Sequence, residues 1–208
     1  MKKSFALLTA VVATALVITA FRSPGDEKAI ESIAIGTSIP KADLKMKDVS
    51  GKEISLNDAK GKNGLLVIFS CNTCPYVTLY ESRIAEAYSQ ATNFGVGTIV
   101  LNSNEANREG VDSFEEMKKH ATANNYKFNY VVDANSAMAD AFGATRTPEV
   151  FLFDKDGKLI YKGAIDDNPK DMVNAKQRYL PLALNAIRDG VPVAVSSTKS
   201  VGCTIKRK

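Results

Sequence analysis

Two cysteines separated by two residues, Cys71 and Cys74, are the residues of this sequence best suited to chemistry. They follow an apolar run over 65–69 and precede a stretch in which apolar residues recur every three or four positions. At such a strand-to-helix junction the two sulfurs can close a small disulfide loop, and the unpaired N–H groups of the following helix favour a thiolate. Since the thiolate is the nucleophile of thiol-disulfide exchange, the spacing predicts a redox-active pair, with a purely structural disulfide as the alternative.

Composition limits the other classes of function. A chain of 208 residues with 45% hydrophobic residues is long enough for one domain with a continuous core. Its net charge of +4 comes from basic residues that are scattered along the chain, which argues against a nucleic-acid partner. The single histidine, His120, lies in a charged helical stretch and is expected to be solvated, so we predict no metal site and no cofactor. Copper delivery by thiolates is a remote alternative.

The N-terminal segment has the pattern of a secretory signal. Lys2 and Lys3 precede an uncharged run over 5–21, whose 17 residues are at the short limit for a membrane-spanning helix. We therefore predict a signal peptide over 1–22 and export to the periplasm or another extracytoplasmic space, with an uncleaved membrane anchor as the alternative. Outside the cytosol a close cysteine pair is a disulfide unless a reductant is supplied.

Strand and helix patterns alternate along the rest of the chain. Apolar runs predict buried strands over 65–69 and 97–101, and we expect a linker over 23–35, one domain over 36–190 and a C-terminal tail over 191–208 that carries Cys203. The remaining expected elements are hairpins over 45–56 and 149–162, helices over 75–90, 111–124, 137–142 and 181–189, and an extended segment over 129–132. This order predicts an α/β fold with a mixed central sheet flanked by helices on both faces. The polar loop over 102–110 is expected to be a solvated connection.

A second feature is the Thr147-Pro148 junction, which precedes the strand over 149–153. A cis bond there would turn the chain sharply and expose the carbonyl and N–H of Thr147 to a partner, whereas an ordinary trans proline would simply start a strand.

Together these motifs resemble a known family. The segment Cys71-Asn72-Thr73-Cys74-Pro75-Tyr76, the segment over 143–153 and the segment over 202–206 look like those of the peroxiredoxin-like branch of the thioredoxin superfamily. These are redoxin-domain proteins, grouped with the alkyl hydroperoxide reductase and thiol-specific antioxidant family. The resemblance covers about 36–206 and implies a thioredoxin-like fold, a cis Pro148 beside the cysteines and a thiol redox role.

The leading hypothesis is an exported thiol-disulfide oxidoreductase in which Cys71 attacks and Cys74 resolves the mixed disulfide. Thr147 and Pro148 would hold the partner chain. Two further residues are weaker candidates for the substrate site: Arg146, which would stabilise a thiolate or lie on the surface, and Tyr76, which would line the site or pack on the sheet. Pro75 favours Cys74 over Cys71 as the attacking thiol. A proline at the first helical position makes Cys74 the N-cap, where the helix terminus stabilises a thiolate most directly.

The second hypothesis is a thiol peroxidase in which Cys203 is the resolving thiol. Three departures from the family pattern weaken both hypotheses. Leu65 stands where thioredoxins keep a buried acid, Ser70 replaces an aromatic residue, and Ile68 stands three residues before Cys71, where peroxiredoxins have Thr or Ser. The expected partners are protein or small-molecule thiols and disulfides, hydroperoxides under the second hypothesis, and an external reductant.

Overall fold

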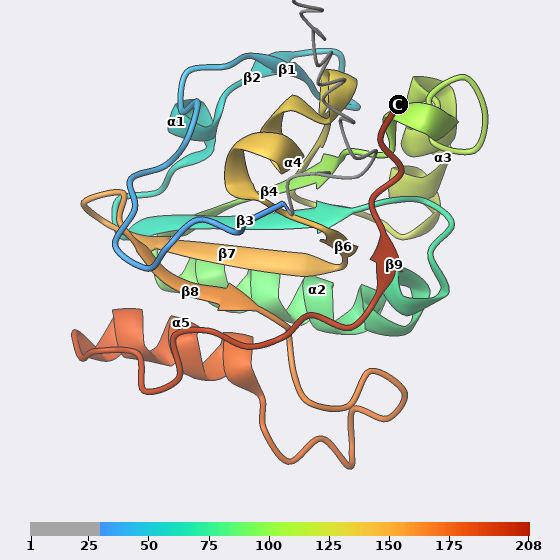
Figure 1. Cartoon of the computed structure of the whole chain (residues 1–208). Coiled ribbons are helices and arrows are strands. Elements are labelled where there is room, and N and C mark those ends of the chain that lie inside the picture. The colour runs from blue at the N-terminus through green and yellow to red at the C-terminus, as the bar shows by residue number, and fades with distance from the viewer. Residues whose placement is uncertain (1–29) are drawn as a thin grey trace, which may run out of the picture.

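The computed structural model describes residues 30–208, and the predicted signal peptide lies outside them. A five-stranded sheet forms the centre, with the strand order β5-β4-β3-β7-β8. Its strands are β3 (Gly64–Ser70), β4 (Val96–Asn102), β5 (Asn129–Val132), β7 (Glu149–Asp154) and β8 (Leu159–Gly163). Helices lie above and below this sheet in Figure 1. The predicted α/β architecture with a mixed central sheet is confirmed.

The central strand β3 explains the apolar run in the sequence. It pairs in parallel with β4 and antiparallel with β7, in a register that sets Phe69 opposite Glu149. Every residue of β3 is buried, because helices cover both faces of the sheet. A strand with no solvated face has no reason to alternate polar and apolar residues.

Two apolar clusters fill the space on either side of the sheet. One joins the sheet to α2 (Pro75–Asn93), α3 (Phe114–Ala123) and α5 (Tyr179–Asp189). The other joins the sheet to α1 (Leu56–Ala59) and α4 (Ala137–Phe142). The smaller elements are the hairpin β1 (Met46–Lys47) and β2 (Glu53–Ile54), the 3-10 turns η1 (Glu105–Asn107) and η2 (Ala134–Ser136), and the pair β6 (Arg146–Thr147) and β9 (Cys203–Thr204). Across residues 30–208, no helix has both the length and the apolar character needed to cross a bilayer.

Two helices begin at other residues than the sequence predicted. Helix α5 begins at Tyr179, so Pro181 is its third residue and not its first. Proline is tolerated there because the first N–H groups of a helix have no partner within the helix. Helix α3 begins at Phe114, and its N-cap Ser113 accepts a hydrogen bond from the N–H of Glu116.

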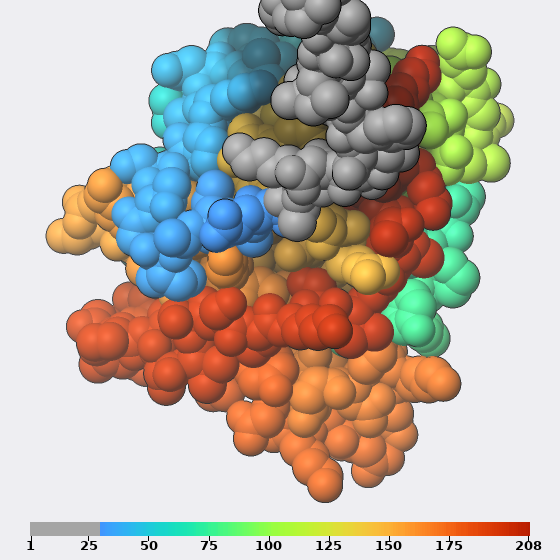
Figure 2. Space-filling view, viewed as in Figure 1, coloured from blue at the N-terminus to red at the C-terminus, as the bar shows by residue number. Residues whose placement is uncertain are grey.

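The C-terminal segment over 191–208 lies against the body of the protein. It first follows the edge strand β8, where the N–H of Thr198 donates to the carbonyl of Lys162. It then turns toward β6 and pairs with it as β9, ending near the top of the view in Figure 1. Figure 2 shows this segment, in red, crossing the front surface of the molecule.

Candidate functional site

The two motif cysteines lie where β3 ends and α2 begins. Cys74 is the N-cap of α2 and Pro75 is its first residue, as the sequence indicated. The side chains of Cys71 and Cys74 are only 2% and 3% exposed, and both sulfurs are free thiols. The site therefore combines a helix N-terminus with near-complete burial, two influences that act on a thiol in opposite directions.

Hydrogen bonds decide between these influences at Cys74. A hydrogen bond from the Cys71 thiol lowers the pKa of Cys74 to about 4, and further bonds come from Cys203 and from the Val77 N–H. The same bond raises the pKa of Cys71 well above its usual range, and burial and the negative charge of Asp112 act in the same direction. These directions favour ionisation of Cys74 over ionisation of Cys71.

Thr147 closes the site from the opposite side. Its peptide bond to Pro148 is cis. Its hydroxyl oxygen lies 3.5 Å from the Sγ of Cys71, and its carbonyl oxygen lies 3.3 Å from the Sγ of Cys74. The carboxylate of Glu149 supports this turn by accepting hydrogen bonds from the N–H groups of Thr145 and Arg146.

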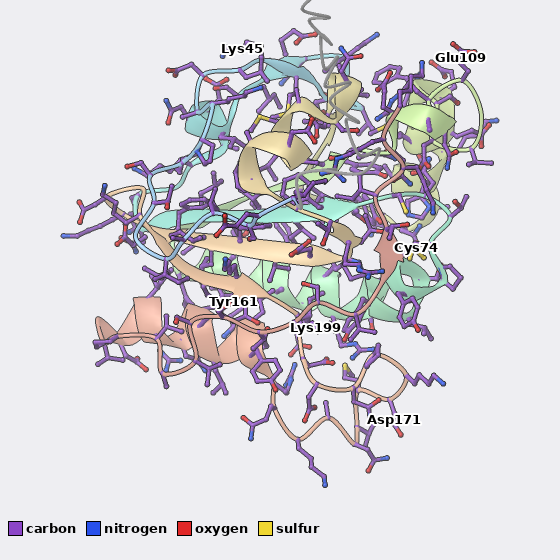
Figure 3. The ribbon with its side chains drawn as sticks, in the orientation of Figure 1. Lys45, Cys74, Glu109, Tyr161, Asp171 and Lys199 are labelled. Atoms are coloured by element: carbon purple, nitrogen blue, oxygen red, sulfur yellow. The ribbon has the colours of Figure 1, made fainter. Side chains whose placement is uncertain are left out.

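The edge beside Thr147 is covered by the end of the chain itself. In the antiparallel pair of β6 and β9, Cys203 lies directly opposite Thr147. Cys203 and Tyr76 pack against the two motif cysteines, and Figure 3 shows Cys74 beside the β9 arrow. The expectation that the backbone of Thr147 is open to a partner is therefore corrected, because a local strand occupies that edge. Burial raises the pKa of Cys203 to about 11.

Arg146 and His120 are placed differently from the sequence-based expectation. The guanidinium of Arg146 donates to the carbonyl of Gly202, so this side chain holds the C-terminal segment. His120 is not solvated: its side chain is 16% exposed, and its Nε2 lies 3.0 Å from a carboxylate oxygen of Glu81 and 2.9 Å from the hydroxyl of Tyr126. Among residues 30–208, no group of three or more His, Cys, Asp or Glu side chains is arranged to hold a metal ion.

A buried polar network next to the motif was missed by the sequence analysis. Asp112 is fully buried and accepts hydrogen bonds from the N–H of Asn72 at 2.9 Å and from the amide of Asn102 at 2.8 Å. The side chain of Asn72 in turn accepts a hydrogen bond from the hydroxyl of Tyr130. The beginning of the loop over 102–110 is therefore buried, not solvated, and Asp112 connects it to Asn72, one of the two residues between the cysteines. The density of Asn and Asp after a strand was the only signal for it.

Comparison with known proteins agrees with this geometry. The Redoxin family model matches residues 34–178, more than half of the sequence. This chain belongs to the Redoxin family. The thiol-disulfide oxidoreductase ResA of Bacillus thuringiensis is 28% identical to this redoxin over 132 residues, which cover 62% of this chain and 69% of that protein.

Two solved structures resemble this redoxin over most of its length. An uncharacterised conserved protein from Geobacillus kaustophilus has a TM-score of 0.78 at 32% identity, covering 84% of this chain and 93% of that chain. A hypothetical protein from Sinorhizobium meliloti 1021 has a TM-score of 0.77 at 31% identity, covering 86% of this chain and 97% of that chain. The predictions of a redoxin with a thioredoxin-like fold and of a thiol-disulfide oxidoreductase are confirmed by these similarities.

Proposed function

We propose that this redoxin exchanges disulfides through Cys71 and Cys74, with Cys74 as the attacking sulfur. One observation carries the proposal: Cys74 is the N-cap of α2, where the unpaired N–H groups of the helix favour a thiolate, and the pKa of Cys74 is lowered. This reverses the roles expected from the family resemblance. A thiolate that exists at neutral pH attacks a disulfide, whereas a protonated thiol does not.

The exchange has two steps. The Cys74 thiolate attacks one sulfur of a substrate disulfide, a new S–S bond forms, and the other substrate sulfur leaves as a thiolate. Cys71 then gives up its proton and attacks Cys74, which forms the Cys71–Cys74 disulfide and expels the second substrate thiol. The protein is oxidised by two electrons and the substrate is reduced by two, and the reverse sequence oxidises a dithiol substrate.

A trapping experiment tests which cysteine attacks. Because Cys203 contacts Cys74, it is replaced by serine in both arms. We expect Cys71→Ser/Cys203→Ser to accumulate a mixed disulfide with a peptide disulfide, and Cys74→Ser/Cys203→Ser to accumulate far less. The reverse result would return the attacking role to Cys71, and no adduct in either variant would remove both cysteines from the reaction.

The proposed cellular setting is outside the cytosol, after export directed by 1–22. The support is the charged start at Lys2 and Lys3 followed by the apolar run over 5–21. The substrates would then be thiols and disulfides of exported proteins or small molecules, and an external reductant would reset the pair. Cell fractionation tests this: recovery in the cytosol would contradict it, and release from membranes only by detergent would favour the uncleaved anchor.

A thiol peroxidase is the second candidate, and the position of Cys203 beside Cys74 favours it. A hydroperoxide would oxidise the Cys74 thiolate to a sulfenic acid and leave as an alcohol, and a neighbouring thiol would condense with the sulfenic acid and release water. Consumption of peroxide by the reduced protein, lost in Cys74→Ser, would support this activity. If the reduced protein consumes peroxide no faster than Cys74→Ser does, peroxidase activity is excluded.

A further inference from the structure

The pairing of β6 with β9 directs a third thiol toward the motif. Residues directly opposite one another in an antiparallel pair place their side chains on the same face. Thr147 turns its hydroxyl toward the motif, where it lies 3.5 Å from the Sγ of Cys71. Since Cys203 lies opposite Thr147, its side chain points the same way, and it packs against the cluster that Cys71, Cys74 and Val77 form, with Cys74 as its side-chain partner.

Contacts on both sides of Cys203 hold it in this position. Before it, the carbonyl of Gly202 accepts a hydrogen bond from Arg146 at 3.3 Å. After it, Ile205 is 6% exposed within the apolar cluster that joins the sheet to α1 and α4, and Arg207 forms an ion pair with Asp140 at 2.7 Å. These contacts on both sides hold Cys203 beside the motif cysteines.

Gly202 shows how tightly the two strands approach. A Cβ atom added at this residue would lie 2.1 Å from the carbonyl oxygen of Thr147, a distance that backbone atoms cannot accept. Only glycine lets β9 come so near to β6, so this residue sets how closely Cys203 approaches Cys74.

We propose that Cys203 is a third redox thiol, which forms a disulfide with Cys74 while β9 lies in the position of a substrate strand. The proposal rests on disulfide exchange at Cys74. When Cys74 carries a mixed disulfide, Cys203 gives up its proton and attacks the Cys74 sulfur. The Cys74–Cys203 bond forms, and the bound thiol leaves as a thiolate. Cys71 can then attack Cys74 and free Cys203, so that no net electrons are gained or lost in this second exchange.

The reduced Cys71→Ser variant tests the proposal with an aromatic disulfide, dithiobis(nitrobenzoate), as oxidant. We expect Cys74 to react first, Cys203 to expel the aromatic thiolate from it, and peptide mapping to find Cys74 joined to Cys203. The matched control Cys71→Ser/Cys203→Ser should retain the aromatic adduct on Cys74. An adduct that stays on Cys74 in Cys71→Ser, with Cys203 still open to alkylation, would overturn the proposal.

The same reagent separates this proposal from the function on which it rests. Cys203→Ser should still close the Cys71–Cys74 disulfide. If it does while Cys71→Ser forms no Cys74–Cys203 bond, the exchange function stands and the third thiol is rejected. If neither variant closes a disulfide, the exchange function itself fails.

A glycine pair tests the part played by β9. In the Cys71→Ser background, Gly202→Ala should slow closure of the Cys74–Cys203 disulfide by roughly 10- to 100-fold, because the added Cβ separates the strands. Gly110→Ala is the control, since its Cβ would meet its nearest neighbour at 3.7 Å. Closure in Gly202→Ala at the rate of the control would show that strand pairing does not position Cys203. Where Gly202→Ala fails to fold, the peptide map of Cys71→Ser decides alone.

Discussion

The Sγ of Cys74 lies 3.3 Å from the carbonyl oxygen of Thr147, although 73 positions separate the two residues in the chain. In its thiol form Cys74 donates a hydrogen bond to this oxygen. In its thiolate form it has no proton to donate and takes its hydrogen bonds from Cys71, Cys203 and the Val77 N–H. The surroundings of this sulfur therefore offer partners to both protonation states, as disulfide exchange requires.

Replacement of Cys71 should raise the pKa of Cys74. The Cys71 thiol is the largest cause of the lowered value, so Cys71→Ala should raise the pKa more than Cys203→Ala, whose contribution is smaller. Ultraviolet absorbance of the thiolate against pH measures the change in the reduced protein. Equal pKa changes in the two variants would show that Cys71 does not lower the pKa of Cys74 more than Cys203 does.

The stability of the reduced protein should depend on pH through Cys74. Its pKa is lowered from 9.0 to about 4 on folding, so the thiolate stabilises the native state fully above the unfolded value and loses this contribution as the pH falls toward 4. We expect the difference in unfolding free energy between the reduced protein and Cys74→Ala to grow from pH 4 to pH 9. Urea titrations of both proteins across this range measure it, and a constant difference would refute the assignment of the thiolate.

Asp112→Asn should lower the pKa of Cys71 and destabilise the fold. The substitution removes a negative charge that raises the pKa of Cys71. It also replaces one carboxylate oxygen, which accepts hydrogen bonds from its neighbours, with an NH₂ group that cannot accept them. An unsatisfied buried donor costs about 1–3 kcal/mol. Chemical denaturation measures the cost, and the exposed Glu109→Gln is the control, expected to change stability by less than about 0.5 kcal/mol. Similar stability of the two variants would show that the network is not held by the Asp112 charge.

Breaking the buried ion pair between Arg83 and Asp166 should lower the free energy of unfolding more than breaking an exposed ion pair. Their side chains are 4% and 2% exposed, and Arg83 also donates to the carbonyls of Asn168 and Pro169. Arg83→Ala leaves a buried carboxylate without its partner, a loss of about 3–5 kcal/mol.

The exposed pair of Arg178 and Glu86 provides the comparison for that loss. Arg178→Ala should cost about 0–1 kcal/mol in the same urea titration, because water screens the charges. An Arg83→Ala variant as stable as Arg178→Ala would mean that the loop over 164–178 relaxes and lets water reach Asp166.

The sequence predicts the centre of this fold better than its rim. The strands over 65–69 and 97–101 were predictable because complete burial leaves an unbroken apolar run, and the N-cap at Cys74 was predictable because Pro75 marks a first helical turn. The burial of Asp112 was not, since a carboxylate at the expected start of a helix looks solvated until distant residues close over it. Likewise, the two-residue strand β9 is too short to show any periodicity, and its pairing depends on a contact with Thr147 far back in the chain.

The anchored C-terminus has a practical consequence for producing this protein. Arg207, next to the last residue, is bound to Asp140 and to the carbonyl of Ala144, so anything fused after Lys208 begins on the surface that carries β9. A purification tag added there would begin close to the strand that covers the sulfurs, so rates of cysteine variants should be compared after the tag has been removed.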